Sequence, residues 1–132
     1  MSPRLLLDTH IILRWLYDPK RLSRDQWRAI ETSASRREPL GVSASSLPEI
    51  AVLVNDDRFE VNGPLDEFLD SLDQSPFQVI PLTPGVAFEA GSLKVLKDPT
   101  DRAIAATARV HGLRLVTSDS RIIDSKLVST IE

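Results

Sequence analysis

The sequence of 132 residues contains no cysteine and no hydrophobic run long enough to cross a membrane. Without cysteine the chain has no disulfides, no thiolate nucleophile and none of the thiolate ligands that most structural zinc sites use. A membrane-spanning helix needs about 20 consecutive apolar residues, and the N-terminus lacks the charged-then-apolar pattern of a signal peptide. We therefore expect a soluble, unprocessed, cytoplasmic protein whose chemistry depends on oxygen groups.

Positive charge is also scarce, with 16 Lys and Arg against 19 Asp and Glu and a formal net charge of -3. No compact basic tract appears, and no basic patch is interleaved with aromatic residues as in many nucleic-acid-binding surfaces. Twelve of the sixteen basic residues are arginine, whose planar guanidinium suits phosphate. Solvated helix faces account for most of them, so the charge balance does not identify a ligand.

Two carboxylates come directly after predicted strands. Asp8 follows the apolar run of residues 4–7, which predicts a buried parallel strand, and precedes an amphipathic helix over residues 9–17. Asp119 follows a second predicted strand, residues 113–117, at a turn or helix start. Because ligands collect at the carboxyl ends of strands in open α/β sheets, we expect both acids at one edge of the sheet.

Two further carboxylates, Glu49 and Asp101, are predicted to lie on the buried stripes of helices. Apolar residues follow each acid at helical spacing: Val52 and Leu53 after Glu49, and Ile104, Ala105 and Ala108 after Asp101. A buried carboxylate is costly unless it is paired, hydrogen-bonded or bound to a metal. The predicted burial of Glu49 and Asp101 therefore requires an explanation, whereas an acid on the solvated surface would require none.

Each acid taken alone has a simpler structural explanation. Asp98 is a good N-cap for a helix in which Asp101 faces the macrodipole, and Asp8 and Asp119 could cap the helices that follow them. Glu49 could bond a serine or a backbone donor in its first helical turn. Independent caps have no reason to include two acids on core-facing stripes as well as two at strand ends, whereas a shared acidic site explains all four acids together.

Strands and helices alternate along the chain. Strands are predicted at residues 4–7, 40–42, 77–80, 113–117 and 128–131, and helices at 9–17, from 23, from 46, after 64, from 83 and over 98–111. Such alternation is typical of a three-layer α/β/α domain with a largely parallel central sheet. No linker, repeat or low-complexity tract appears, so we expect one domain over residues 1–132.

Four segments together resemble the PIN-domain nucleases, and within that family they are most similar to VapC toxins. These segments are residues 6–10 (Leu-Leu-Asp-Thr-His), 46–51 (Ser-Leu-Pro-Glu-Ile-Ala), 98–108, which begins Asp-Pro-Thr-Asp-Arg, and 115–119 (Leu-Val-Thr-Ser-Asp). They occur in the family's order and span nearly the whole chain. The resemblance implies a PIN-like fold and a metal-dependent endoribonuclease, the toxin of a toxin-antitoxin pair.

The resemblance also implies roles for individual residues. The four metal-binding acids map to Asp8, Glu49, Asp101 and Asp119, the accessory acid to Asp98, and a supporting hydroxyl to Thr117 or Ser118. Carboxylate oxygens suit Mg²⁺ or Mn²⁺, and two such ions can activate water and stabilise the leaving oxygen. Within this scheme Asp8 and Asp101 are direct ligands, Asp119 binds a weaker ion, and Glu49 acts through water or orients the nucleophile.

The implied partners are RNA, a VapB-like antitoxin that sends a basic side chain into the acidic pocket, and a second copy of the chain. The predicted partner-facing residues are Trp15, Leu16, Trp27 and Leu53, although helical spacing also permits the tryptophans to lie in the core. His10 and His111 are interpreted as structural, His111 because a cation complements a helix C-terminus.

Three other interpretations of the sequence are possible. A receiver domain needs an adjacent acidic pair after the first strand, and a haloacid-dehalogenase phosphatase needs a second aspartate at the place of His10; neither requirement is met. The remaining alternative is an inactive PIN-like module that binds RNA or protein.

The sequence departs from the family pattern at residues 55–60, which are acidic where the family is often basic. The position of Glu49 also depends on a helix boundary, because Pro48 is tolerated only in the first turn of its helix.

Overall fold

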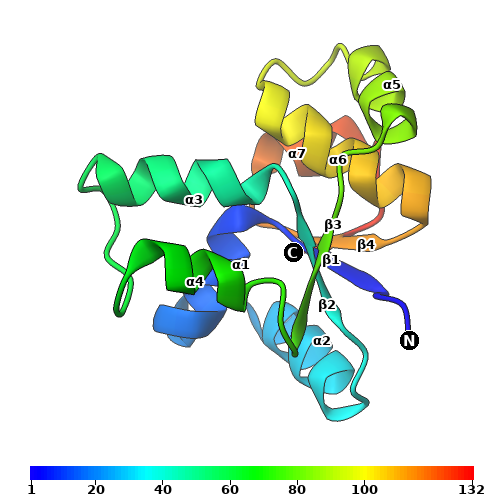
Figure 1. Cartoon of the computed structure of the whole chain (residues 1–132). Helices are drawn as coiled ribbons and strands as arrows, with labels where there is room; N and C mark the ends of the chain where they lie inside the picture. Colours follow the sequence, from blue (N-terminus) through cyan, green and yellow to red (C-terminus); the bar gives the residue numbers. More distant parts are fainter.

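A parallel sheet of five short strands forms the centre of the computed structural model, which describes all 132 residues (Figure 1). The strands are β1 (Leu5–Leu7), β2 (Leu40–Ser43), β3 (Phe77–Ile80), β4 (Arg114–Val116) and β5 (Thr130–Ile131). Their order in the sheet is β3-β2-β1-β4-β5, and every neighbouring pair is parallel. The predicted α/β fold with a largely parallel sheet is confirmed.

The chain changes direction across the sheet at β1. It passes from β1 through β2 to β3 on one side and then returns to place β4 on the other side of β1. Leu7 pairs in register with Val116, and the Asp8 N–H donates to the Val116 carbonyl at 3.0 Å. The residues that follow β1 and β4 therefore emerge at one edge, the crevice where ligands bind in such sheets.

Seven α-helices and one 3₁₀ turn connect the strands. They are α1 (Thr9–Tyr17), η1 (Pro19–Arg21), α2 (Arg24–Ser35), α3 (Ser46–Asn55), α4 (Leu65–Ser71), α5 (Pro84–Ser92), α6 (Pro99–His111) and α7 (Ser120–Ser125). Ser23, Thr83 and Asp98 cap α2, α5 and α6 with their side chains, as their sequence contexts predict. The turn η1 was not predicted, and α7 was predicted only as a turn or helix start.

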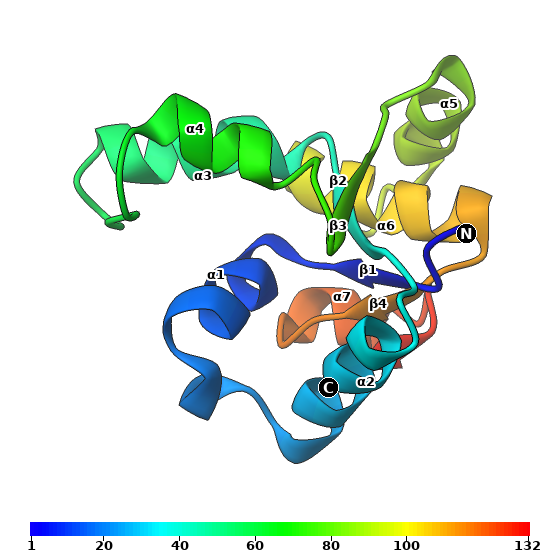
Figure 2. The same cartoon turned by 60° about the horizontal axis from the view of Figure 1, so that its bottom comes forward.

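The core lies on both faces of the sheet because β1 is buried on both sides. Leu5 and Leu7 pack with buried residues of α1 to α4, whereas Leu6 packs with buried residues of α5, α6 and α7. Figure 2 shows α1 and α2 on one side of the strands and α5 and α6 on the other. The continuous apolar run is what a strand with two covered faces requires. None of the helices combines the length and apolar character needed to cross a bilayer.

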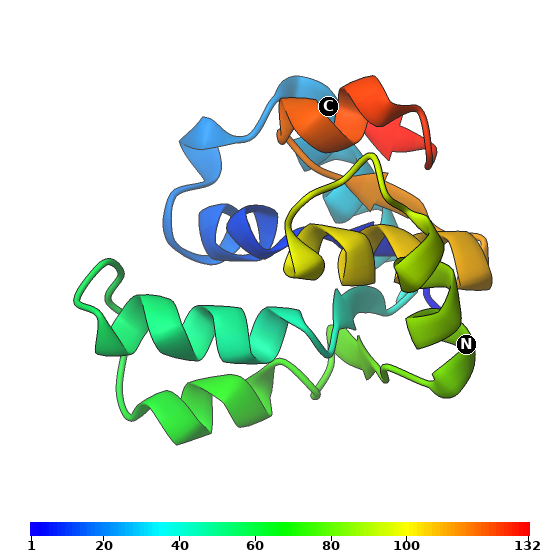
Figure 3. The ribbon, with the colours of Figure 1, turned by 90° about the horizontal axis from the view of Figure 1, so that it is seen from above.

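Helices α3 and α4 lie side by side, and α3 runs away from the sheet before α4 returns beside it (Figure 3). This projection corrects one expectation: Val52 is 52% exposed, and Ile50 is the fully buried hydrophobic residue of α3. Helix α3 contacts α4, α1, α6 and strand β2, and these neighbours cover a different stripe of the helix from the predicted one. Pro48 is the third residue of α3, inside the first turn as predicted.

Candidate active site

Asp8 is the most enclosed of the four predicted acids, with 4% of its surface exposed. It is the N-cap of α1, and its Oδ1 accepts the Thr9 N–H at 2.8 Å. The Thr117 hydroxyl donates to Asp8 Oδ2 at 2.7 Å and accepts the Asp119 N–H at 3.0 Å. Asp8 thus caps α1, and this cap and the hydrogen bond from Thr117 together fix the orientation of the buried carboxylate.

Asp119 caps α7 and makes a close ion pair with Arg121. Its Oδ1 accepts the backbone N–H of Arg121 at 2.9 Å. The guanidinium Nε of Arg121 lies 3.2 Å from Oδ1, and its Nη2 lies 2.9 Å from Oδ2. The side-chain hydrogen bond from Arg121 lowers the pKa of Asp119 below its ordinary value, more than burial raises it. Asp119 is therefore ionised at neutral pH and already faces a cation.

Asp101 lies in the first turn of α6, and its side chain is 14% exposed. Its Oδ2 lies 3.4 Å from the same Nη2 of Arg121. Burial is the largest cause of a rise in the pKa of Asp101 from 3.8 to about 6; the carboxylates of Asp119, Asp98 and Asp8 contribute to this rise, and Arg121 opposes it. These acids are therefore close enough to repel one another, which is a common property of functional sites.

Glu49 reaches the site from α3 and is held by Thr9. The Thr9 hydroxyl donates to Glu49 Oε1 and lies 2.8 Å from the Ser46 hydroxyl. Because a hydroxyl has one hydrogen, Ser46 donates to Thr9 in this arrangement. Burial raises the pKa of Glu49, the hydrogen bond from Thr9 lowers it, and the charge of Asp8 raises it again. The donor to Glu49 is thus a threonine of α1, not the expected serine or backbone group.

Ser118 is the residue through which α1 and α2 are bonded to the loop before Asp119. Gln26, which is 1% exposed on α2, donates to the Ser118 hydroxyl at 2.9 Å and to the Thr117 carbonyl at 3.2 Å. Arg14 of α1 donates to the same hydroxyl at 3.3 Å. Ser118 therefore contacts the supporting helices, whereas the hydroxyl that contacts Asp8 is that of Thr117.

His10 connects α1 to the same loop. Its Nε2 accepts the Ser118 N–H at 3.0 Å, so the ring is neutral with its proton on Nδ1, which lies 3.6 Å from Asp8 Oδ2. Burial lowers the pKa of His10, while the charge of Asp8 acts in the opposite direction. A neutral ring that accepts a backbone hydrogen bond agrees with the structural interpretation of this histidine.

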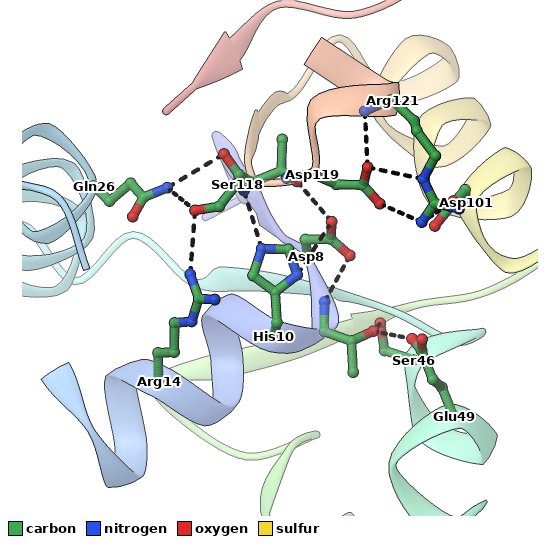
Figure 4. A network of polar contacts seen from close by, with 12 residues as sticks. Asp8, His10, Arg14, Gln26, Ser46, Glu49, Asp101, Ser118, Asp119 and Arg121 are labelled. Carbon is green, nitrogen blue, oxygen red and sulfur yellow. Dashed lines mark hydrogen bonds and ion pairs between the residues drawn. The ribbon is translucent and has the colours of Figure 1, made fainter. Parts of the chain in front are cut away.

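The structure brings the four predicted acids together from the ends of β1 and β4 and from α3 and α6 (Figure 4). A set of carboxylates that repel one another, with no sulfur or other soft ligand, suits a hard divalent cation. As the side chains stand, no three aspartate, glutamate or histidine residues are placed to hold one ion. The guanidinium of Arg121 instead lies against Asp101 and Asp119. The donor chemistry fits a metal, and a basic side chain occupies part of the donor set.

Sequence reasoning did not identify Arg121 or Gln26 as part of this site. Gln26 had a detectable signal, because Ser23 and Gln26 form a capping box whose side chains satisfy each other's backbone N–H. That pattern predicts the start of α2 but not the contact of Gln26 with the β4–α7 loop. Arg121 had no signal, since its direction depends on the start of a helix that the sequence left undecided.

The four predicted partner-facing residues are not equally accessible. Leu16 and Trp27 are 41% and 49% exposed, whereas Leu53 packs against the core. Trp15 is also partly buried, packs edge-on against Phe77 at 5.7 Å and donates its indole N–H to Glu31 at 3.0 Å. Trp15 is therefore at least in part a packing residue, as helical spacing permitted.

Known proteins resemble this chain in sequence and in fold. A family model described as PIN domain matches residues 5–126. Ribonuclease VapC22 of Mycobacterium tuberculosis is 38% identical over 120 residues, which make up 89% of this chain and 88% of the relative. This identity extends over almost the whole length of both proteins.

Two solved structures share the fold. The crystal structure of FitAcB from Neisseria gonorrhoeae contains a chain with a TM-score of 0.67 and 24% identity, covering 97% of this chain and 96% of that one. VapBC2 from Rickettsia felis, bound to a DNA fragment from its promoter, has a TM-score of 0.71 and 16% identity, covering 98% and 97%. At these identities the likeness concerns the fold alone.

Proposed function

The chain belongs to the PIN-domain family, and from that premise we propose that it is a metal-dependent endoribonuclease that hydrolyses RNA phosphodiester bonds as the toxin of a toxin-antitoxin pair. The observation that carries the proposal is the convergence of four carboxylates from four elements at the switch point of the sheet. The identity to a protein named as a ribonuclease supports the substrate class. Gathering like charges is electrostatically costly, and a bound cation would offset that cost.

The four acids divide into direct and indirect ligands in this proposal. Asp8 and Asp101 bind Mg²⁺ or Mn²⁺ directly, Asp119 binds a more weakly held ion, and Glu49 acts through water or orients the attacking water. When bound, such ions supply a more acidic water and a positive charge beside the leaving oxygen. The accessory acid Asp98 already uses its Oδ1 to cap α6, accepting the Thr100 N–H at 2.7 Å, so its contribution is to local charge and helix position.

Several groups of the chain hold these acids in place. The hydroxyl of Thr117 and the N–H of Thr9 fix the two oxygens of Asp8, and the hydroxyl of Thr9 also restrains Glu49. One threonine therefore links two acids that come from different elements. Pre-organised ligands lose little entropy when an ion or substrate binds, which is why rigid supporting contacts raise the efficiency of such sites.

The proposed partners follow from the relatives. We propose a VapB-like antitoxin, because solved structures with this fold include toxin-antitoxin complexes, and a homodimer, by family resemblance. Leu16 and Trp27 are the accessible members of the proposed partner surface. We further propose that residues 1–132 act as one PIN domain.

The deciding experiment incubates the purified, partner-free protein and its Asp8→Asn variant with total cellular RNA. Each protein is tested with Mg²⁺, with Mn²⁺ and with a chelator, and the new RNA ends are mapped by sequencing. The proposal expects discrete cuts that require both Asp8 and a metal, and these cuts would also identify the RNA. Equal background in every reaction, from protein shown to be folded by circular dichroism, would instead favour the inactive binding module.

A further inference from the structure

Arg121 is the one cation in direct contact with two of the four acids. We propose that Arg121 is an internal counter-ion that neutralises Asp101 and Asp119 in the metal-free protein and must leave them when a divalent cation binds. Arg121 would thereby weaken metal binding and determine the ion concentration at which the site is filled. This inference rests on the proposed metal-dependent function and adds a competitor that belongs to the chain itself.

The geometry is that of a shared cation. Nε and Nη2 of Arg121 face the two oxygens of Asp119 at 3.2 and 2.9 Å, the fork-like arrangement that arginine forms with carboxylates. The same Nη2 lies 3.4 Å from Asp101 Oδ2. A single guanidinium thus bridges an acid at the end of β4 and an acid of α6. A divalent cation bound between these two carboxylates would need the same oxygen atoms.

Arg121 is placed so that it can leave. Its side chain is 69% exposed, and its hydrogen bonds and ion pairs are made to these two acids alone. Water would solvate the released guanidinium well, whereas the carboxylates of Asp101 and Asp119 are only 14% and 17% exposed and would be compensated by the bound ion. A divalent ion carries twice the charge and binds several oxygens at once. The arginine is therefore strong enough to hold the empty acid pair together and weak enough to be displaced.

Asp119 would keep its orientation after that displacement. Its Oδ1 also accepts the backbone N–H of Arg121 at 2.9 Å, a contact that belongs to the cap of α7 and does not depend on the guanidinium. Asp101 differs, because Arg121 is the only group with which its side chain pairs. Release of the arginine therefore frees Asp101 while the helix cap still holds Asp119.

The contrast with Asp8 supports a division within the acidic site. Both oxygens of Asp8 are held by neutral donors, the Thr9 N–H and the Thr117 hydroxyl, and neither donor is a cation that a metal would replace. Asp101 and Asp119 are instead held by a positive charge. The carboxylate of Asp8 is therefore held in place whether or not an ion is bound, whereas Asp101 and Asp119 are held by an arginine that takes the place of the ion.

The test measures Mn²⁺ affinity by titration calorimetry, and by the free-Mn²⁺ signal in electron paramagnetic resonance, without any RNA. The proteins are the wild type, Arg121→Gln, Arg121→Lys and the control Arg14→Gln. Arg14 contacts Ser118 near the site but neither Asp101 nor Asp119, so its replacement changes the net charge equally without freeing the acid pair. Circular dichroism establishes that each variant is folded, and melting in chelator measures the stability of the metal-free state.

We expect Arg121→Gln to bind Mn²⁺ about tenfold more tightly than the wild type and to melt at a lower temperature in chelator, because the two acids then repel each other without a counter-ion. Arg121→Lys should remain within about threefold of the wild type, and Arg14→Gln within about twofold. A residue with only a structural role would lower stability without raising metal affinity. A higher Mn²⁺ affinity together with a lower melting temperature in Arg121→Gln would therefore identify Arg121 as a competitor of the metal ion.

Other results would overturn the inference in distinguishable ways. Equal or weaker Mn²⁺ binding by Arg121→Gln would remove Arg121 as a competitor and leave the proposed metal dependence intact. If Arg14→Gln gained as much Mn²⁺ affinity as Arg121→Gln, the gain would be due to the change in net charge and not to the contacts of Arg121. If neither the wild type nor Arg121→Gln, both folded, bound Mn²⁺ at millimolar concentration, the inference and the proposed metal-dependent function would fail together.

Discussion

The two ends of the central sheet differ in what they offer a ligand. The amino end adjoins the largest cavity, about 1040 Å³, which is lined in part by Arg4, Arg28, Arg36 and Arg114. The carboxyl end carries the acidic site, and none of its four acids lines that cavity. Size alone would select the amino end. The carboxyl end is instead selected as the candidate active site by several acids that lie close together and shift one another's pKa values. This criterion is closer to what catalysis requires than the size of a cavity.

The acids at the two ends also have different surroundings. Glu38, at the amino end, has a side chain that is 10% exposed and is paired with Arg4 at 2.8 Å. Asp101, at the carboxyl end, faces Asp119, Asp98 and Asp8 as well as Arg121. A paired acid is an ordinary structural feature, whereas acids gathered against their own repulsion indicate a function that compensates for the cost. The comparison can be tested by changing each end separately.

The largest expected effect is on RNA cleavage. Asp101→Asn should lower the cleavage rate by more than about 100-fold, because it removes a proposed direct ligand. Arg36→Gln, which removes a charge beside the large cavity, should change the rate by less than about twofold. Initial rates on one RNA substrate with saturating Mn²⁺ provide the measurement. A loss in Arg36→Gln equal to that in Asp101→Asn would reverse the comparison between the two ends.

A smaller effect is expected where the acidic end is tied to α2. Gln26→Ala should lower the free energy of unfolding by about 2 kcal/mol, because the buried side chain bonds Ser118, the Thr117 carbonyl and the backbone of Ser23. Gln74→Ala, at an exposed position, should change it by less than about 0.5 kcal/mol. Urea unfolding of the metal-free protein measures both. Equal effects would show that Gln26 does not anchor the loop.

A third prediction concerns pH and the stability of the metal-free protein. The folded protein raises the pKa of Asp101 to about 6, so it binds this proton more tightly than the unfolded chain, whose ordinary pKa is 3.8. The resulting stabilisation is complete below pH 3.8 and is lost as the pH rises through about 6. Asp101→Asn avoids this loss.

Urea unfolding in chelator at pH 4 and pH 7 tests this linkage. Relative to the wild type, the inactive Asp101→Asn variant should gain about 1 kcal/mol of unfolding free energy between the two pH values, a figure reduced for solvent screening. Gln74→Ala, which removes an exposed side chain that does not titrate, serves as the comparison and should show no such gain. A difference between Asp101→Asn and wild type that did not change with pH would contradict the proposed repulsion among the acids.

The smallest effect is expected for the ion pair at the amino end. Arg4→Gln should cost about 0.5 kcal/mol of unfolding free energy at low ionic strength, because Arg4 is largely exposed. Most of that difference should disappear in 1 M salt, which screens exposed charges. Thermal or urea unfolding at the two salt concentrations checks this. A salt-independent loss of several kcal/mol would mean that the ion pair between Arg4 and Glu38 behaves as a buried one, in which the loss of Arg4 leaves an uncompensated charge on Glu38.

Local sequence patterns predicted much of the fold. The apolar run before Asp8 predicted a doubly covered strand, and the capping residues Ser23, Thr83 and Asp98 predicted three helix starts. The direction of α3 was harder to predict, and Val52 is exposed because the helix leaves the sheet. Burial of a helix face depends on what packs against it, and that information is not contained in the helix itself.

What the sequence determined by itself was where several strands and helices begin, because capping and periodicity act between neighbours in the chain. It also supplied the four acids and their family pattern. Only the tertiary structure decided that Arg121 lies between Asp101 and Asp119 and that Gln26 reaches Ser118, since these contacts join α7 to α6 and α2 to the β4–α7 loop. The contacts of Arg121 with Asp101 and of Gln26 with Ser118 depend on how whole elements pack against one another, and no local rule relates residues so far apart.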